Sequence, residues 1–244
     1  MSDVNLLIDK LKKANQKKSL DIFLPTLGKK VKFAPLTLKQ QKELLSKVPE
    51  TSYDIVQFNN IFNSIIVSNN EEEVKLSDLK NIDKFAIVLQ YKINMTGSTY
   101  KVGKKTVSLN QLLEKINEYD YSIFTKIESV SLDNLSAELE APNLEYDAKI
   151  NKSVTALIKN KNKNNAMAEL FLSEFIKYIK SITLDDDKFN LTSLSYDDKL
   201  TIVEELPSSF TRKIIDYMDV IKTEENKLSY INGITVDITN DLFA

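Results

Sequence analysis

Apolar positions recur at helical spacing along most of the chain. The first stretch, residues 3–14, places Val4, Leu7, Ile8 and Leu11 on one side and predicts a short amphipathic helix. Thr37 and Gln40 have the spacing of a capping box, which predicts that a helix starts at Leu38 and runs until Pro49. The same periodicity predicts further helices at residues 53–67, after Ser77 and Asp78 (carrying Leu79, Ile82, Ala86 and Leu89), and at residues 166–182, 196–206 and 208–225.

Other stretches have the pattern of strands and turns. Residues 20–24 and 31–33 are separated by Pro25 and Gly28 and predict a hairpin. At the other end, Asn232-Gly233 stands between alternating apolar residues, a strong signal for a two-residue hairpin turn. The middle of the chain predicts a hairpin at 99–107, a short helix after Ser108, and strands near 122–132 and 137–150, with a loop over the Lys/Asn tract 159–165.

Together these elements predict an α+β protein in which helices predominate, with an N-terminal hairpin, a β-rich middle segment and a C-terminal hairpin. We divide the chain into 1–92 (hairpin plus helical block), 93–152 (β-rich middle) and 153–244 (helical block ending in a hairpin), with one continuous domain as the alternative.

Composition removes several classes of function. The 244 residues contain neither cysteine nor histidine, which excludes disulfides, Cys/His zinc sites and catalytic triads or dyads that use histidine. The net charge of −2 argues against nucleic acid as the dominant partner. The sequence has no apolar run long enough to span a bilayer, and its first residues lack the order of a signal peptide, so we expect an intracellular protein.

Two motifs resemble known ligand-binding loops but lack residues that those loops require. Gly97 to Thr106 resembles a phosphate-binding loop, but five residues separate its glycines and Lys105 stands where a serine or threonine is required. Asp185, Asp186 and Asp187, with Asp197 and Asp198, suggest calcium, yet Asn190 and Tyr196 occupy the positions that an EF-hand gives to glycine and glutamate. We therefore expect a hairpin and a solvated acidic loop, and no cofactor.

Lysines gather near the N-terminus at positions 10, 12, 13, 17, 18, 29, 30 and 32, interrupted by acidic residues, and arginine occurs once, as Arg212. A solvated face is the favoured interpretation. The exposed edges of the two terminal hairpins offer a different possibility, because unpaired strand edges can add to the sheet of another protein. The residues we predict for such an interface are Lys29, Phe33, Tyr230, Val236 and Phe243; packing of both hairpins on the chain's own helices is the alternative.

The N-terminal block resembles the opening of the baseplate hub family of T4-like contractile-tail bacteriophages. It runs from Ile22-Phe23-Leu24-Pro25-Thr26-Leu27-Gly28 through Val31-Lys32-Phe33 to a helix that begins near Thr37-Leu38-Lys39-Gln40. Residues 168–180 and the ending from Gly233 to Phe243 are similar more loosely, and the chain length and Lys/Asn/Ile-rich composition fit such a phage.

The resemblance implies a non-enzymatic protein that binds other baseplate or hub proteins, as a hub component or an assembly chaperone. It implies a location in the host cytoplasm during assembly, with the virion baseplate as a second location, and it transfers no site residues. Two alternatives stay open: a nucleic-acid-associated factor that uses the N-terminal lysines, and, more remotely, a hydrolase that uses paired carboxylates. The sequence does not fix the oligomeric state.

Overall fold

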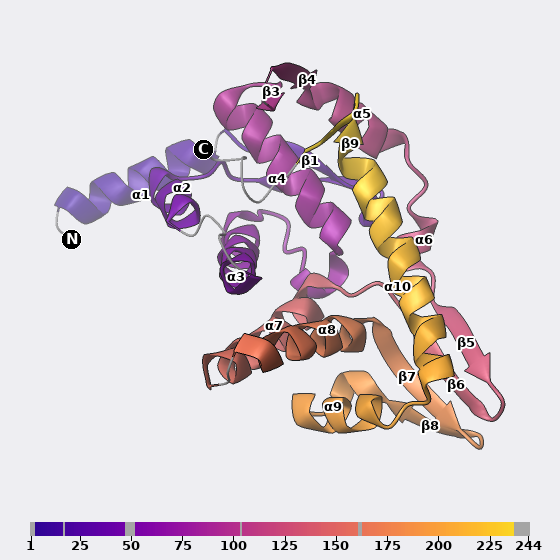
Figure 1. Ribbon diagram of the computed structural model, residues 1–244. Coiled ribbons are helices and arrows are strands. Elements are labelled where there is room, and N and C mark those ends of the chain that lie inside the picture. Colours follow the sequence, from indigo (N-terminus) through magenta and orange to yellow (C-terminus); the bar gives the residue numbers. More distant parts are fainter. Residues whose placement is uncertain (1–2, 17, 47–51, 103, 161–162, 237–244) are drawn as a thin grey trace. The chain divides into compact units, whose positions relative to one another are not determined.

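A computed structural model describes residues 3–16, 18–46, 52–102, 104–160 and 163–236 (Figure 1). Helices make up 60% and strands 21% of the protein, which confirms the predicted α+β class with helices predominating. The chain forms two compact units, one of residues 1–119 and 229–244 and one of residues 120–228. The boundaries predicted at 92/93 and 152/153 both fall inside helices.

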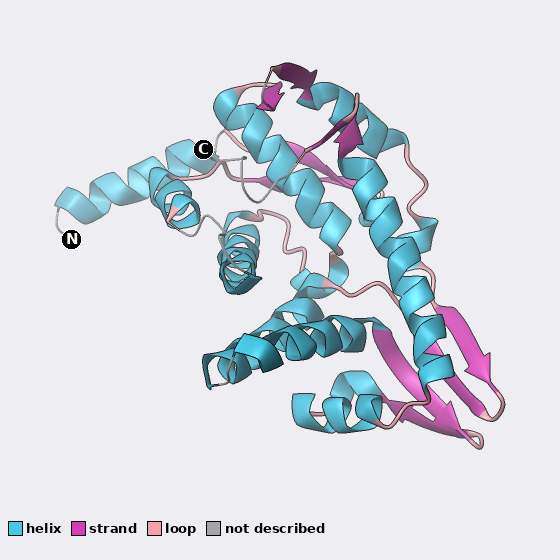
Figure 2. Ribbon diagram, in the orientation of Figure 1, coloured by secondary structure: helices cyan, strands magenta, loops and turns pink. Residues whose placement is uncertain are grey.

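The first unit contains mostly helices and three two-stranded hairpins (Figure 2). Its elements are α1 (Asp3–Gln16), β1 (Leu20–Leu24), the 3-10 helix η1 (Pro25–Leu27), β2 (Lys29–Phe33), α2 (Leu38–Leu45), α3 (Ser52–Asn69), η2 (Leu76–Asp78), α4 (Asn81–Thr96), β3 (Thr99–Val102), β4 (Lys105–Ser108), α5 (Leu109–Glu118), β9 (Tyr230–Ile231) and β10 (Ile234–Thr235).

The second unit is built on an antiparallel sheet in the order β5-β6-β7-β8. Its elements are α6 (Ser122–Thr125), β5 (Glu128–Leu132), β6 (Leu135–Leu139), α7 (Leu144–Asn160), α8 (Lys163–Tyr178), β7 (Ile179–Leu184), β8 (Asp187–Asn190), η3 (Leu191–Ser193), α9 (Tyr196–Glu204) and α10 (Ser208–Ser229), whose last residue belongs to the first unit. The helical pair α7–α8 connects the two central strands.

The predicted N-terminal hairpin is confirmed, and alternation explains its packing. Ile22 and Leu24 of β1 are buried, as are Val31 and Phe33 of β2, while the lysines of β2 are exposed. The strands pair antiparallel from Leu20 opposite Phe33 to Leu24 opposite Lys29. Because apolar residues occupy one face only, the hairpin packs that face within its unit, where β1 and η1 contact α4 (Figure 1).

The predicted capping box at the start of α2 is also present. The Gln40 amide N–H donates to the Thr37 hydroxyl over 3.3 Å, and the Thr37 amide N–H donates to Gln40 Oε1 over 2.9 Å. Gln40 Nε2 also donates to Asn69 Oδ1 over 2.7 Å, and Tyr91 donates to the Ala34 carbonyl over 3.0 Å. These bonds link the end of the hairpin with α2, α3 and α4.

Two of the two-residue hairpin turns have positive φ at both central positions. Asn232 and Gly233 have φ of 51° and 80°, and Asp185 and Asp186 have φ of 50° and 73°. Such angles are those of a type I′ turn, in which Asn, Asp and Gly are favoured. The C-terminal hairpin is therefore confirmed, and the acidic cluster lies in the turn between β7 and β8.

Several predicted elements need correction. Residues 122–125 form α6 before β5 begins, and the strand predicted over 137–150 ends at Leu139, with α7 starting at Leu144. The Lys/Asn tract is helical at residues 159–160 and 163–165. Helix α8 stops at Tyr178, because Ile179 and Ile182 pair with Leu139 and Ala137 in the sheet.

The start of α4 also differs from the prediction. Ser77 and Asp78 lie in η2, and α4 begins at Asn81 with Lys80 as its N-cap. Asp83, the third residue of the helix, accepts a hydrogen bond from the Lys80 amide over 2.8 Å. The helix then runs to Thr96, so the β-rich middle starts later than Tyr91.

Candidate protein-interaction surfaces

Helix α1 carries an apolar stripe that its own chain leaves in water. Val4, Leu7, Ile8 and Leu11 are 64%, 58%, 43% and 61% exposed. Their spacing puts all four on one face of the helix. A helix of a folded protein normally buries such a face, and an exposed one is typical of a surface that binds another molecule.

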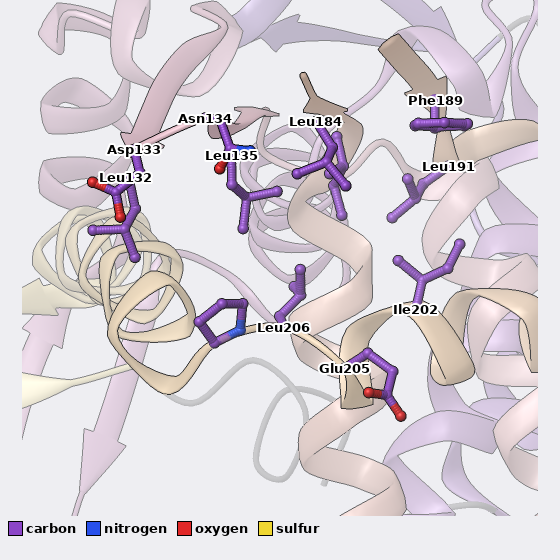
Figure 3. A pocket seen from close by; sticks show the side chains of 12 residues that line it. Leu132, Asp133, Asn134, Leu135, Leu184, Phe189, Leu191, Ile202, Glu205 and Leu206 are labelled. Carbon is purple, nitrogen blue, oxygen red and sulfur yellow. The ribbon is translucent and has the colours of Figure 1, made fainter. Parts of the chain in front are cut away.

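The second unit holds an apolar groove of about 500 Å³ between its sheet and the end of α9 (Figure 3). Leucines from β5, β6 and β7 face Ile202 of α9 and Leu206 of the turn after it. Asp133 and Glu205 are the charged residues of its lining, and both are exposed. Leu184 and Phe189 at the groove remain 44% and 53% exposed, so this apolar surface is open to solvent.

The terminal hairpins carry the residues predicted from the sequence, and the structure places them differently. Lys29 is exposed at the start of β2, and Tyr230 is half exposed at the start of β9. Phe33 and Val236 are buried within the first unit. Phe243 lies outside the described residues. Lys29 and Tyr230 are thus the two predicted residues whose side chains are seen to reach solvent, and the role of the set in an interface stays a prediction.

The C-terminal hairpin is fixed to its own unit. The amide of Val236 donates to the Ser229 carbonyl over 2.8 Å, and Lys115 of α5 donates from Nζ to the Tyr230 carbonyl over 3.0 Å. With Ile234 and Val236 buried, the hairpin is anchored on one side while the Tyr230 ring is left accessible on the surface.

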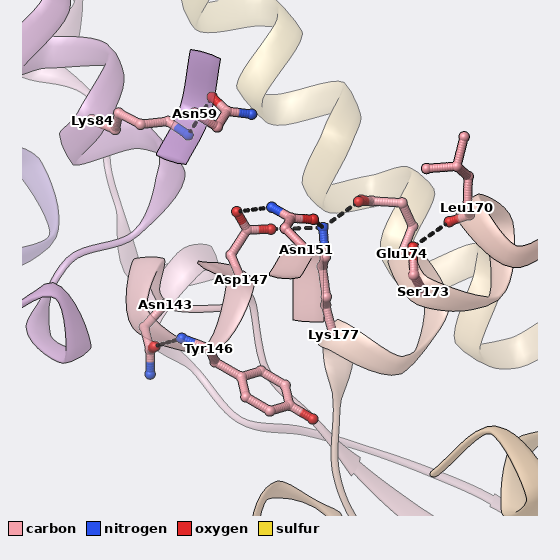
Figure 4. A network of polar contacts seen from close by, with 10 residues as sticks. All are labelled: Asn59, Lys84, Asn143, Tyr146, Asp147, Asn151, Leu170, Ser173, Glu174 and Lys177. Carbon is pink, nitrogen blue, oxygen red and sulfur yellow. Dashed lines mark hydrogen bonds and ion pairs between the residues drawn. The ribbon is translucent and has the colours of Figure 1, made fainter. Parts of the chain in front are cut away.

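A buried charge cluster joins α7 and α8 (Figure 4). Lys177 Nζ lies 2.7 Å from Asp147 Oδ1 and donates to Asn151 Oδ1 over 2.9 Å, and it also contacts the Glu174 carboxylate. Asn151 Nδ2 completes the ring by donating to Asp147 Oδ2 over 2.8 Å. The side chains of Lys177 and Asp147 are 3% and 9% exposed, so this ion pair is inside the protein.

The electrostatics of this cluster indicate a structural role. Burial alone lowers the pKa of the Lys177 ammonium, but the charges of Asp147 and Glu174 outweigh burial and raise it above its ordinary value. A lysine nucleophile needs the opposite, a neutral amine near neutral pH. The cluster therefore holds two helices together by a fully bonded cation.

A second buried acid anchors the N-terminal turn. Asp83 Oδ1 accepts from the Thr26 amide over 2.9 Å, and its other oxygen accepts from the Thr26 hydroxyl and from the Lys80 amide over 2.8 Å. Burial raises the pKa of the Asp83 carboxyl, against the lowering effect of these hydrogen bonds. Asp83 thus ties η1 to the first turn of α4, a role that the sequence did not reveal.

A second buried lysine, Lys199, contacts an aromatic ring. Its Nζ lies 4.8 Å from the centre of the Tyr146 ring, and burial lowers the pKa of its ammonium. Burial also raises the pKa of Tyr146 to about 12. This cation–π contact links α7 to α9 within the second unit.

The glycine-containing segment and the acidic residues that invited a chemical interpretation take structural roles, in a hairpin and at a helix start. Residues 99–108 form the hairpin β3–β4, as predicted, with Gly97 ending α4 at φ 88°. Asp197 and Asp198 lie in the first turn of α9, where the Asp198 amide donates to Ser195 Oγ over 3.2 Å. Within the described ranges, no three acidic side chains are grouped so that they could hold a metal ion.

Comparison with models of protein families, with curated proteins and with solved structures gives no match to this chain. In the part of the chain that the structure describes, no helix combines the length and apolar character needed to cross a membrane.

Proposed function

We propose that this chain is a non-enzymatic tail protein of a T4-like contractile-tail bacteriophage. In this proposal it binds other tail proteins during formation of the baseplate hub, as a hub component or as an assembly chaperone. The observation that carries the proposal is the N-terminal block from Ile22 to Leu45, whose residues resemble the opening of that family.

Within this block, residues that resemble the phage family stabilise the fold. Gln40 of the shared helix start closes the capping box and also bonds Asn69 of α3. Thr26 of the shared turn bonds Asp83 of α4 through its amide and its hydroxyl. Residues that fix a fold in this way are those that proteins of one fold would share, whatever their function.

The exposed apolar groups support binding to proteins. The half-exposed Tyr230 ring is of a kind that is enriched where proteins meet, and the α1 stripe is an exposed apolar surface of the kind that marks interaction sites. Acidic side chains lie beside the N-terminal lysines, since Glu72 accepts a hydrogen bond from the Lys32 amide and Glu71 accepts one from Ser19. This mixture of charge favours a protein partner over a phosphate backbone.

The proposal is tested by affinity capture of the tagged full-length chain from cells infected with the phage that encodes it. Mass spectrometry of the captured material and of purified virions gives two readouts. Recovery of hub proteins supports the proposal. Presence of the chain in virions then identifies a hub component, and its absence identifies an assembly chaperone. Capture of nucleic acid or host proteins without tail proteins would overturn the proposal.

A matched pair of variants tests the hairpin surface. Tyr230→Glu places a charge at the exposed ring of β9, whereas Val220→Glu does so on α10 at a residue with similar exposure. If the C-terminal hairpin contacts a hub protein, Tyr230→Glu reduces the recovery of that protein and Val220→Glu does not. Equal recovery with both variants would remove Tyr230 from the interface.

A further inference from the structure

The groove of the second unit has the chemistry of a site for an amphipathic helix. Its walls are aliphatic and aromatic, and its volume of about 500 Å³ can take several aliphatic side chains. Figure 3 shows Leu135 and Leu184 pointing into it from the sheet, opposite Ile202 and Leu206. Helices bind such grooves through apolar residues at positions i, i+3, i+4 and i+7.

The charges at the groove select a basic partner. Asp133 and Glu205 are part of its lining, and no basic residue is among the lining residues. The turn between β7 and β8 adds Asp185 and Asp186 close by, because Asn134 of the groove lining donates to the Asp185 carboxylate. We call Asp133, Asp185, Asp186 and Glu205 the acidic margin of the groove. A helix with an apolar stripe and cations beside it would match both the apolar walls and this acidic margin.

Helix α1 is a segment with these properties. Val4, Leu7, Ile8 and Leu11 have the required i, i+3, i+4, i+7 spacing and are uncovered. The stripe is about 10 Å long at the rise of an α-helix. Lys10, Lys12 and Lys13 lie in the second half of α1, and the sequence has no acidic residue from Lys10 to Lys18, so this end of α1 is basic.

We propose that α1 of one copy of this chain docks in the groove of a second copy. The stripe would enter the groove, and the lysines that follow Asp9 would lie against the acidic margin. The two surfaces in this contact are different, so the contact is heterologous: the copy whose stripe is docked keeps an unused groove, and the copy whose groove is filled keeps an unused stripe. Copies would then join head to tail into a ring or an open chain. The inference needs only this chain and does not rest on the proposed function.

Sedimentation of the full-length protein over a range of concentrations tests this proposal. We expect the average mass to rise with concentration, with measurements reaching roughly 0.5 mM because an interface below the standard size of about 1,600 Å² binds weakly. Leu7→Glu/Leu11→Glu in the stripe and Leu184→Glu/Phe189→Glu in the groove should each weaken association by at least roughly tenfold.

Two control variants have similar exposure at other places. Leu6→Glu changes α1 on the side away from the stripe, and Ile127→Glu changes the second unit outside the groove lining. Both controls should associate like the original protein. Circular dichroism checks that every variant retains its helices.

Mixing the two interface variants gives the decisive result. The stripe variant keeps a working groove, and the groove variant keeps a working stripe, so an equimolar mixture should form a one-to-one dimer that grows no further. A mixture that stays monomeric would overturn the heterologous contact, as a symmetric contact or a general loss of structure gives that result. A protein that is monomeric at all concentrations, or association that the variants leave intact, would overturn the proposal as well. Capture of hub proteins is unaffected by these outcomes, so this proposal and the proposed function can fail separately.

Discussion

Helix α1 and the helical pair α7–α8 depart from the usual distribution of residues in opposite directions. In α1, four aliphatic side chains of one stripe lie in water. In α7–α8, Lys177 and Asp147 lie inside the protein, form an ion pair and both hydrogen-bond to Asn151. The first departure leaves apolar surface without a cover, which a partner can supply. The second offers nothing to a partner protein, because the buried charges are already paired with each other within the unit.

The comparison separates residues that hold the fold from residues that are available for binding. Removal of one partner of a buried ion pair costs stability, whereas substitution of an exposed apolar side chain changes stability little. Substitutions in the two regions should therefore have opposite effects on unfolding and on association.

The largest effect on stability is expected from Lys177→Met. The change removes the cation and leaves Asp147 buried without its ion-pair partner, which typically costs about 3–5 kcal/mol. Chemical denaturation monitored by circular dichroism measures the free energy of unfolding. The control is Lys149→Met, which breaks the exposed pair with Glu145 on the same helix α7 and should cost under about 1 kcal/mol. Equal costs for the two variants would contradict a structural role for the cluster.

A smaller loss is expected from Asp83→Ala. The Thr26 amide, the Thr26 hydroxyl and the Lys80 amide each lose an acceptor in a buried place, for a cost of about 2–3 kcal/mol. Asp78→Ala is the control, because Asp78 also accepts from a backbone amide at a helix start but is exposed. If Asp83→Ala were no worse than the control, Asp83 would not anchor the turn between β1 and β2.

Titration of the Asp83 carboxyl should make the free energy of unfolding depend on pH. Burial raises the pKa of its carboxyl in the folded protein above the ordinary value of 3.8. At a pH between 3.8 and the raised pKa, the folded state holds a proton that the unfolded state has lost. The contribution of Asp83 to stability therefore falls as pH rises through this window. Denaturation curves across the window should show this fall in the original protein and a smaller fall in Asp83→Asn. Identical pH profiles would show that the Asp83 carboxyl titrates normally.

Apolar periodicity, the capping box at Thr37 and the turn residues together predicted the helices of the first unit and both terminal hairpins. Periodicity missed α7 because Asp147 and Asn151 occupy buried positions of that helix, and polar residues at buried positions hide the apolar repeat. It misplaced the end of α8 because pairing with Leu139 and Ala137 decides where a strand takes over from the helix. Residue spacing carries no information on partners so distant in the sequence.

The candidate surfaces were predictable to different degrees. The stripe of α1 is visible in the sequence, since it depends on one helix alone. Its exposure is not, because burial depends on what the rest of the chain covers. The groove was missed because its walls come from β5, β6, β7 and α9, and the sequence does not say which segments face each other. The burial of Phe33 and Val236 likewise follows from tertiary packing.

The smallest effect on stability is expected in α1. Leu7→Glu/Leu11→Glu changes two side chains that are already in water, so the free energy of unfolding should change by under about 0.5 kcal/mol per substitution. The same denaturation assay measures this change, with Leu6→Glu as the control on the other side of the helix. A loss as large as that of Lys177→Met would show that the stripe is packed within its own unit, and the contrast between the two regions would not hold.

The proposal that this chain binds baseplate proteins is tested most directly by titrating the purified chain with each purified hub protein of the phage that encodes it. Light scattering of the mixtures reports whether a complex of defined mass forms. We expect a saturable complex with at least one hub protein. A chain that remains monodisperse and indifferent to every hub protein would contradict it.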